Sequence, residues 1–207
     1  MAQLVVGSNS YAVPDSRGID LGSTLDGGQA FRWYGNPEAG YRGVIGDAVY
    51  LIFPGGTGVE FEVLAGAKPE DPVATVSDYL GCNSDFAGFM ERYRSDEVIG
   101  PALMAWAGLR VLRQDPWENL VAVITSATSN VPRIKLNVGS IACELGNRIG
   151  DGDRDFQFPS PATVRGAGED RLRELRLGFR APYIVEAAER VADGRVPIYE
   201  LREAGYV

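Results

Sequence analysis

A row of small polar residues separates two apolar stretches at residues 124–134, which read ITSATSNVPRI. The plainest interpretation is a connection between two helices, for which a single capping residue would suffice. Thr128, Ser129 and Asn130 can also hydrogen-bond a ligand, and Arg133 would project from the first turn of the second helix. Backbone N–H groups at a helix N-terminus suit a phosphate. The segment is therefore a candidate binding loop for a polar or anionic ligand.

A second candidate is the segment DGGQAFRW at residues 26–33, in which two glycines precede an aromatic stretch. Glycine serves where the backbone takes a positive φ or lies close against another group. A hairpin turn explains the glycine pair most simply. The alternative is a turn whose backbone approaches something else closely.

The third candidate is the segment LRLGFRAPYI at residues 175–184, where Gly178 interrupts a helical pattern. Glycine commonly ends helices, and Phe179 would then lie in the core. An aromatic residue exposed beside an arginine, here Phe179 and Arg180, is instead what a wedge into nucleic acid requires. The local sequence leaves both interpretations open.

The elements that must position these segments change in kind along the chain. Stretches rich in β-branched and aromatic residues, bounded by Gly, Pro or Asn, predict antiparallel strands in the first part. These stretches are QAFRWYG, GYRGVIG, AVYLIFPGG and VEFEVLAG. From Asp71 onward the apolar residues follow a helical period. The sequence predicts an α+β protein with a sheet domain at residues 1–112 and a helical domain at residues 113–207.

The helix on each side of the polar row has its own start signal. Asp115 is a predicted N-cap, followed by Pro116 at the first helical position and Glu118 three residues after the cap. Asn130 is the predicted cap of the next helix, with Pro132 in its first turn. Two earlier helices are predicted to begin at the caps Asn83 and Ser95.

Composition excludes several classes of function. The 207 residues carry a net charge of −8 and include no histidine, which removes the usual hydrolase triads and the commonest metal ligand. We expect no metal and no cofactor. The negative charge argues against nonspecific coating of nucleic acid, although residues 98–150 hold five basic and three acidic residues. No apolar run reaches the length of a bilayer span, no signal pattern is present, and Cys82 and Cys143 lack metal or redox spacing. These features predict a cytoplasmic protein without a membrane segment.

Five segments, taken in order, resemble the 8-oxoguanine DNA glycosylases of the helix–hairpin–helix superfamily. They are LDGGQAFRW, LRQDPWENLVAVITSATSNVPRI, FPSPATV, LRLGFRAPYI and LREAGY, and the resemblance runs from about Asp20 to Val207. It implies a TBP-like sheet domain followed by the first part of an all-helical glycosylase domain. It also implies base-excision repair, in which 8-oxoguanine paired with cytosine is flipped out of double-stranded DNA and excised, with associated AP lyase activity.

The resemblance assigns the contact with the damaged base to Gly28, through its backbone carbonyl. 8-Oxoguanine carries a proton on N7, whereas guanine has a lone pair there. A carbonyl oxygen therefore gains a hydrogen bond from the lesion and repels the normal base. A site built on one specific hydrogen bond can reject the analogue that lacks it by roughly 10⁴ or more.

The resemblance assigns contacts around the vacated space and with the DNA strand opposite the lesion to the segments ITSATSNVPRI and LRLGFRAPYI. Thr128, Ser129 and Asn130 match the loop that enters the space vacated by the flipped base, which is richer in asparagine in many family members. Arg133 and Arg180 match the arginines that read the orphaned cytosine, and Phe179 matches an aromatic wedge that is often tyrosine. Two arginines suit cytosine because its pairing edge presents two acceptors, O2 and N3.

The resemblance places the family's helix–hairpin–helix, its Schiff-base lysine and its catalytic aspartate after the segment LREAGYV. Lys68 and Lys135, the only lysines of the sequence, lie outside the corresponding motif, so no catalytic residue is assigned. We expect a truncated product or fragment with an incomplete helical domain and without lyase activity as supplied.

Two other functions stay open at this point. One is a non-catalytic DNA-damage-binding module, and the other is an alkylated-base glycosylase of the same superfamily. The arginine pair and GGQAFRW favour the oxidised-guanine branch. We expect the partner to be double-stranded DNA containing 8-oxoguanine, the complete protein to be a monomer, and its location to be the nucleoid if the source is prokaryotic.

Overall fold

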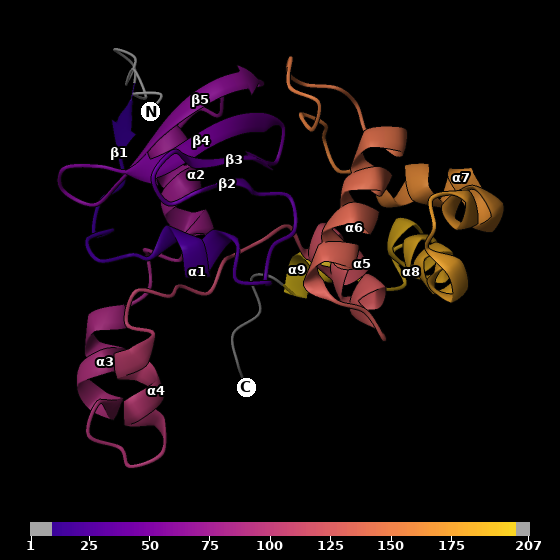
Figure 1. Ribbon diagram of the computed structural model, residues 1–207. Helices are drawn as coiled ribbons and strands as arrows, with labels where there is room; N and C mark the ends of the chain where they lie inside the picture. Colours follow the sequence, from indigo (N-terminus) through magenta and orange to yellow (C-terminus); the bar gives the residue numbers. More distant parts are fainter. Residues whose placement is uncertain (1–9, 202–207) are drawn as a thin grey trace. The chain divides into compact units, whose positions relative to one another are not determined.

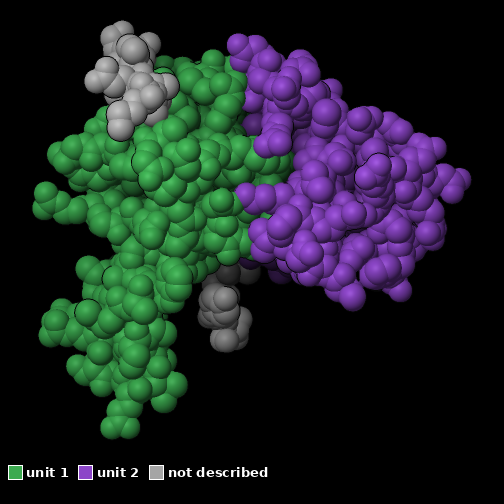
Figure 2. Space-filling model, viewed as in Figure 1, with its two compact units in different colours: residues 1–43, 48–113 green, residues 44–47, 114–207 purple. Residues whose placement is uncertain are grey.

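Residues 10–201 are described by a computed structural model and fall into two compact units (Figure 2). Unit 1 comprises residues 1–43 and 48–113, and unit 2 comprises residues 44–47 and 114–207. An antiparallel sheet precedes an array of helices along the chain, which confirms the predicted α+β class. The motif LREAGY lies outside the described residues after its first residue, Leu201.

The sheet has five strands in the order β1-β5-β4-β3-β2 (Figure 1). They are β1 (Tyr11–Ala12), β2 (Tyr34–Asn36), β3 (Gly40–Ile45), β4 (Ala48–Pro54) and β5 (Val59–Gly66). Cross-strand pairing of β4 with β5 sets Ile52 opposite Phe61, and both side chains are fully buried. Burial of such β-branched and aromatic residues on neighbouring strands is the main stabilisation of a sheet of this kind.

One predicted strand is wrong over most of its length. The segment QAFRWYG at residues 29–35 is strand only from Tyr34, and β1 was not predicted. The indole nitrogen of Trp33 donates to the hydroxyl of Tyr79 at 2.8 Å, and the two rings lie 5.8 Å apart. The side chain of Gln29 is also committed to distant parts of the chain. These tertiary contacts hold residues 29–33 away from a strand conformation.

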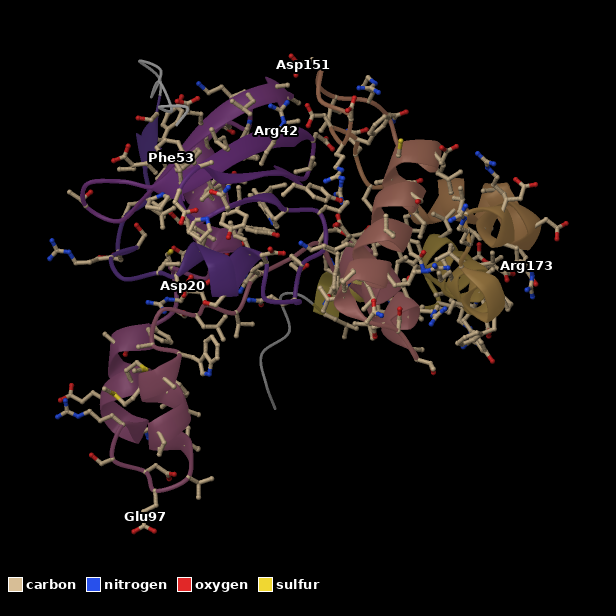
Figure 3. All side chains as sticks on the ribbon, in the orientation of Figure 1. Asp20, Arg42, Phe53, Glu97, Asp151 and Arg173 are labelled. Carbon is tan, nitrogen blue, oxygen red and sulfur yellow. The ribbon has the colours of Figure 1, made fainter. Side chains whose placement is uncertain are left out.

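Unit 1 also contains helices, of which α1 and α2 lie close to the sheet and α3 and α4 lie side by side away from it (Figure 1). They are α1 (Leu21–Leu25), α2 (Pro72–Tyr79), α3 (Phe86–Tyr93) and α4 (Ile99–Ala105). Asp20, labelled in Figure 3, caps α1, whose presence the sequence did not predict. Asp71 caps α2 in the same way, by accepting a hydrogen bond from the backbone N–H of Ala74.

Two predicted caps in unit 1 are wrong. The predicted cap Asn83 is replaced by Asp85, whose carboxylate accepts a hydrogen bond from the backbone N–H of Gly88. The predicted cap Ser95 is also wrong: the N-cap of α4 is Val98, which makes no side-chain cap hydrogen bond, and Asp96 accepts from the N–H groups of both Val98 and Ile99 at 2.8 Å. In each case a nearby carboxylate, and not the predicted residue, accepts from the backbone N–H groups, since an ionised acceptor makes the stronger bond.

Unit 2 is built from helices around one core. They are α5 (Pro116–Ser126), α6 (Val131–Leu145), α7 (Pro161–Glu174), the 3₁₀ turn η1 (Gly178–Arg180), α8 (Ala181–Ala192) and α9 (Ile198–Leu201). The core side chains are Trp117, Val121, Ile141, Val164, Leu172, Leu177, Ala181, Ile184 and Ala188. The predicted caps of α5 and α6 are confirmed, because Asp115 accepts from Glu118 N and Asn130 from Arg133 N.

No helix within residues 10–201 is long and apolar enough to cross a bilayer. In the same residues no group of three or more Cys, Asp or Glu side chains is arranged to hold a metal ion. Cys82 and Cys143 are free thiols.

Candidate nucleic-acid interface

The turn at Gly27–Gly28 follows α1 in unit 1. The interpretation as a hairpin turn is wrong, because a helix and not a strand precedes it. Gly28 has a φ of +97°, the positive value that its glycine pair predicts. A Cβ at Gly27 would lie 2.1 Å from the carbonyl oxygen of Ser23. Only glycine fits at Gly27 without displacing the backbone of α1, and a side chain at Gly28 would be strained.

The side chain of Gln29 fixes the turn. Its amide nitrogen donates to the carbonyl oxygens of Thr24 at 3.0 Å and Arg110 at 2.7 Å. Its amide oxygen accepts from the backbone N–H of Leu112 at 3.0 Å. The hydroxyl of the fully buried Thr24 accepts from Arg110 N at 3.2 Å. The peptide that joins Gly28 to Gln29 is thereby held between α1 and residues 110–112. Gln29 belongs to the motif DGGQAFRW, but no role was predicted for it; its signal in the sequence is a polar residue beside a stretch that becomes buried.

Arg110, whose backbone contacts Gln29 and Thr24, directs its side chain onto the ring of Phe86. Its guanidinium carbon lies 3.6 Å from the ring centroid of Phe86, and it also donates to the carbonyl oxygens of Ala107 and Leu109. Burial lowers the pKa of the Arg110 guanidinium from its ordinary value. An arginine remains charged at neutral pH even so, because its ordinary pKa exceeds 12.

The polar row in unit 2 forms the short connection between α5 and α6. Thr128 is exposed and has a φ of +51°, which is rare for a β-branched residue. The hydroxyl of Ser129 is buried and has no hydrogen-bond partner within the described structure. Asn130 uses its amide oxygen to cap α6, so its NH₂ group remains for another partner. The loop therefore exposes Thr128 and Asn130 and turns the Ser129 hydroxyl inward.

Arg180 holds this loop from η1. Its Nε donates to the carbonyl oxygen of Ala127 at 2.9 Å, and its Nη2 donates to the same oxygen and to that of Thr128 at 3.0 Å. Arg180 is 9% exposed. The guanidinium has five N–H donors, and those on Nη1 are not used in these bonds. Arg180 can thus support the loop and still present one edge to a ligand.

Phe179 and Arg133 lie at the surface of the same part of unit 2. Phe179 is 54% exposed, so the interpretation that places it in the core is wrong. The guanidinium carbon of Arg180 lies 4.5 Å from the centroid of the Phe179 ring. Arg133 is exposed, and its Nη2 donates to the carbonyl oxygen of Arg176 at 3.4 Å. Arg180 therefore joins η1 to the loop, and Arg133 joins the first turn of α6 to the segment just before η1.

The charges around this cluster differ from those on the adjoining helices. The arginines of α7 and α8 form ion pairs with carboxylates: Arg165 with Asp193, Arg171 with Glu144 and Glu174, Arg173 with Glu169, and Arg190 with Glu186. Arg173 is labelled in Figure 3. Within the described residues, Arg133, Arg176 and Arg180 have no carboxylate partner. Their positive charge is unneutralised where the polar loop and the exposed aromatic ring come together, which suits a polyanion.

Both the sequence and the fold are similar to those of known proteins. The family described as 8-oxoguanine DNA glycosylase, N-terminal domain, matches residues 11–120. The protein named N-glycosylase/DNA lyase OGG1 of Arabidopsis thaliana is 30% identical over 171 residues, which cover 80% of this chain and 47% of the relative. This chain thus matches about half the length of that relative.

Two solved structures share the fold of nearly the whole chain. MBOgg1 in complex with a low-affinity DNA ligand superposes with a TM-score of 0.82 at 28% identity, covering 95% of this chain and 70% of that one. The 8-oxoguanine glycosylase/lyase of Clostridium acetobutylicum, bound to double-stranded DNA with cytosine opposite 8-oxoguanine, gives 0.78 at 25% identity. That match covers 87% of this chain and 61% of the other.

Proposed function

Since this chain belongs to the 8-oxoguanine DNA glycosylase family, we propose that it recognises 8-oxoguanine paired with cytosine in double-stranded DNA. The step is part of base-excision repair. The proposal includes DNA N-glycosylase and AP lyase activity for the whole protein, with no catalytic residue assigned among residues 10–201. The two relatives with solved structures support it, since both were captured with DNA.

We assign the contact with the damaged base to the carbonyl oxygen of Gly28. Two observations support the assignment: the positive φ of Gly28 and the three hydrogen bonds of Gln29 that fix the adjoining peptide. A fixed acceptor cannot turn away from the lone pair on N7 of guanine, so its repulsion from the normal base is retained. The proton on N7 of the lesion satisfies the same acceptor.

We propose that Arg133, Arg180 and the loop between α5 and α6 in unit 2 contact the DNA strand opposite the lesion. Thr128 and Asn130 would occupy the space of the flipped base, with Ser129 shaping the loop from within. Arg133 and the free edge of Arg180 would donate to the cytosine, and Phe179 would stack beside it. The observation that carries the proposal is this meeting of unneutralised arginines, a polar loop and an exposed aromatic ring on one small surface.

We further propose that the protein acts as a monomer in the cytoplasm, on the nucleoid if its source is prokaryotic. Its substrate would be chromosomal DNA. The two free cysteines support a reducing compartment, where unpaired thiols persist.

The test is equilibrium binding of the chain to four duplexes that carry 8-oxoguanine or guanine opposite cytosine or adenine. We expect the tightest binding with 8-oxoguanine opposite cytosine. Arg133→Ala and Arg180→Ala should each lose about 1–3 kcal/mol of preference for cytosine over adenine, the usual energy of a specific base contact. Arg173→Gln, which removes an arginine already paired with Glu169, serves as the control.

Equal affinity for all four duplexes would disprove the proposed recognition. A uniform loss for both opposite bases in the arginine variants, with a shallower salt dependence, would mean that these side chains contact the backbone and do not read the base. Tighter binding to an alkylated purine than to 8-oxoguanine would favour the related class of glycosylases instead.

A further inference from the structure

Arg176 occupies a backbone position that usually belongs to glycine. It follows Leu175, the C-cap of α7, and its φ is +66°. Its N–H donates to the carbonyl oxygen of Arg173 at 2.9 Å, and the N–H of Leu177 donates to that of Leu172 at 3.2 Å. Leu172 and Leu177 are both fully buried. This pair of bonds with its apolar contact is a Schellman motif, and Arg176 stands at the C′ position, where glycine avoids the strain of a left-handed conformation.

The side chain of Arg176 makes no contact within the described residues that would compensate for that strain. It is exposed, and no carboxylate, hydrogen-bond acceptor or aromatic ring within the described residues contacts its guanidinium. The arginines just before it along α7 behave differently, since Arg171 and Arg173 each form ion pairs. A strained backbone that places an unused cation at the surface indicates a partner outside the chain.

The position of Arg176 identifies that partner. Its carbonyl oxygen accepts from Arg133, and the next turn of the chain carries Arg180, which grips the loop carbonyls of Ala127 and Thr128. Arg176 therefore belongs to the surface on which Arg133, Arg180 and Phe179 lie. Its exposed guanidinium matches a phosphate, because the planar fork of donors can bind two phosphate oxygens at once.

We propose that Arg176 binds a phosphate of the DNA backbone beside the site where Arg133 and Arg180 act, an inference that rests on the proposed function. A phosphate contact fixes the position of the duplex and carries no sequence information. Arg176 would thus hold the strand in register while its neighbours read the base. The contact with DNA would offset the backbone strain at the end of α7.

The test separates the charge of Arg176 from its backbone strain. Arg176→Gln removes the charge and keeps the strain, Arg176→Lys keeps the charge, and Arg176→Gly removes both. We expect the Gln and Gly variants to bind duplex DNA roughly fivefold more weakly at 0.1 M salt, with a salt slope shallower by about one unit. The loss should be the same for lesion opposite cytosine, lesion opposite adenine and undamaged DNA. Arg176→Lys should recover most of the affinity.

The melting temperatures of the same variants provide a second test, since Arg176→Gly should bind DNA more weakly and yet melt at a higher temperature. Arg176→Gly should melt a few degrees higher than the unmodified chain, because glycine adopts this φ without strain, whereas Arg176→Gln should not. Arg173→Gln is the matched control, since it removes one positive charge three residues away and should leave the salt slope unchanged. Weaker binding combined with a higher melting temperature in Arg176→Gly is the expected result.

Three outcomes would overturn the inference. If the unmodified chain binds DNA and Arg176→Gln binds as well as it does, the phosphate contact is wrong while the proposed function stands. If Arg173→Gln loses as much affinity as Arg176→Gln, the effect is general charge and not a contact. If the unmodified chain binds no duplex, the inference and the proposed recognition by this chain fail together.

Discussion

The turn at residues 26–29 in unit 1 and the loop at residues 127–130 in unit 2 are proposed to contact opposite strands of the substrate, and they differ in how their conformations are held. The turn is held by three hydrogen bonds of Gln29, and its positive φ falls on a glycine. The loop has a strained threonine, and among residues 10–201 its buried Ser129 hydroxyl has no hydrogen-bond partner and the neighbouring arginines have no carboxylate partner. An acceptor on the backbone discriminates only if it is fixed in advance, whereas side chains that enter DNA must leave groups unsatisfied until the DNA arrives.

The comparison predicts that the largest loss of stability comes from the fixed turn. Gln29→Ala removes three hydrogen bonds and leaves the partly buried carbonyl oxygen of Arg110 and N–H of Leu112 without their side-chain partner. We expect a loss of about 2–4 kcal/mol in the free energy of unfolding of unit 1, measured by urea denaturation. Gln29→Met, which keeps most of the volume, should lose nearly as much. A loss below about 1 kcal/mol in both would show that Gln29 does not hold the turn.

Replacing Arg133 in α6 and replacing Arg180 in η1 should affect stability differently, although both arginines are proposed to read cytosine. Arg180→Ala removes a nearly buried side chain that donates to two loop carbonyls, so unit 2 should lose about 2 kcal/mol. Arg133→Ala removes an exposed side chain with one long hydrogen bond and should cost less than about 0.5 kcal/mol. Thermal unfolding of the two variants measures the difference. Equal destabilisation would contradict the supporting role of Arg180.

Raising the pH above 10 should lower the stability of unit 1 through Tyr50 in its core. Tyr50 of unit 1 is fully buried, its hydroxyl has no hydrogen-bond partner in the described part of the chain, and burial raises its pKa to about 12. Because the unfolded chain releases this proton near pH 10 and the folded chain retains it, stability is fully present below pH 10 and declines as the pH rises towards 12. We expect unit 1 to lose up to about 2 kcal/mol in that range. Tyr50→Phe should remove the contribution of Tyr50 to this decline without affecting unit 2, as followed by unfolding at pH 9, 10 and 11. Burial also raises the pKa of Tyr41 and of Cys82 in unit 1, so part of the decline should remain.

The sequence predicted those parts of the fold that depend on local signals. Asp115 and Asn130 were predicted as caps because each stands directly before a proline-containing first turn with a clear apolar period. Asn83 and Ser95 failed because a carboxylate one or two residues later is the better acceptor. No local rule reports such a competition, which depends on the exact path of the chain.

In the candidate site, the unusual backbone conformation could be predicted from the sequence at glycine and could not be predicted at other residue types. The pair before Gln29 indicated a special backbone, and Gly28 has the positive φ. Thr128 and Arg176 have the same kind of conformation, yet neither residue type signals it. The role of Gln29 depends on residues 110–112, which lie about eighty positions away, and only the folded structure reveals that contact. Strain on non-glycine residues is therefore the part of this site that sequence reasoning misses.

A small gain in stability is predicted at Thr128, and it tests whether that strain is real. Thr128→Asn should stabilise unit 2 by about 0.5–1 kcal/mol, because asparagine tolerates a positive φ and threonine does not. Thr128→Val is the matched control: it keeps the branched Cβ and loses only the hydroxyl, so it should bring no gain. Unchanged stability in Thr128→Asn would mean that the surrounding contacts, including the bond from Arg180 to the Thr128 carbonyl, already compensate the strain. If the loop conformation is the one that enters DNA, Thr128→Asn should also bind a lesion-containing duplex at least as tightly as the unmodified chain, since the ordering cost is lower and the longer amide reaches further. Weaker binding in a more stable protein would show that the loop must leave this conformation to reach the DNA.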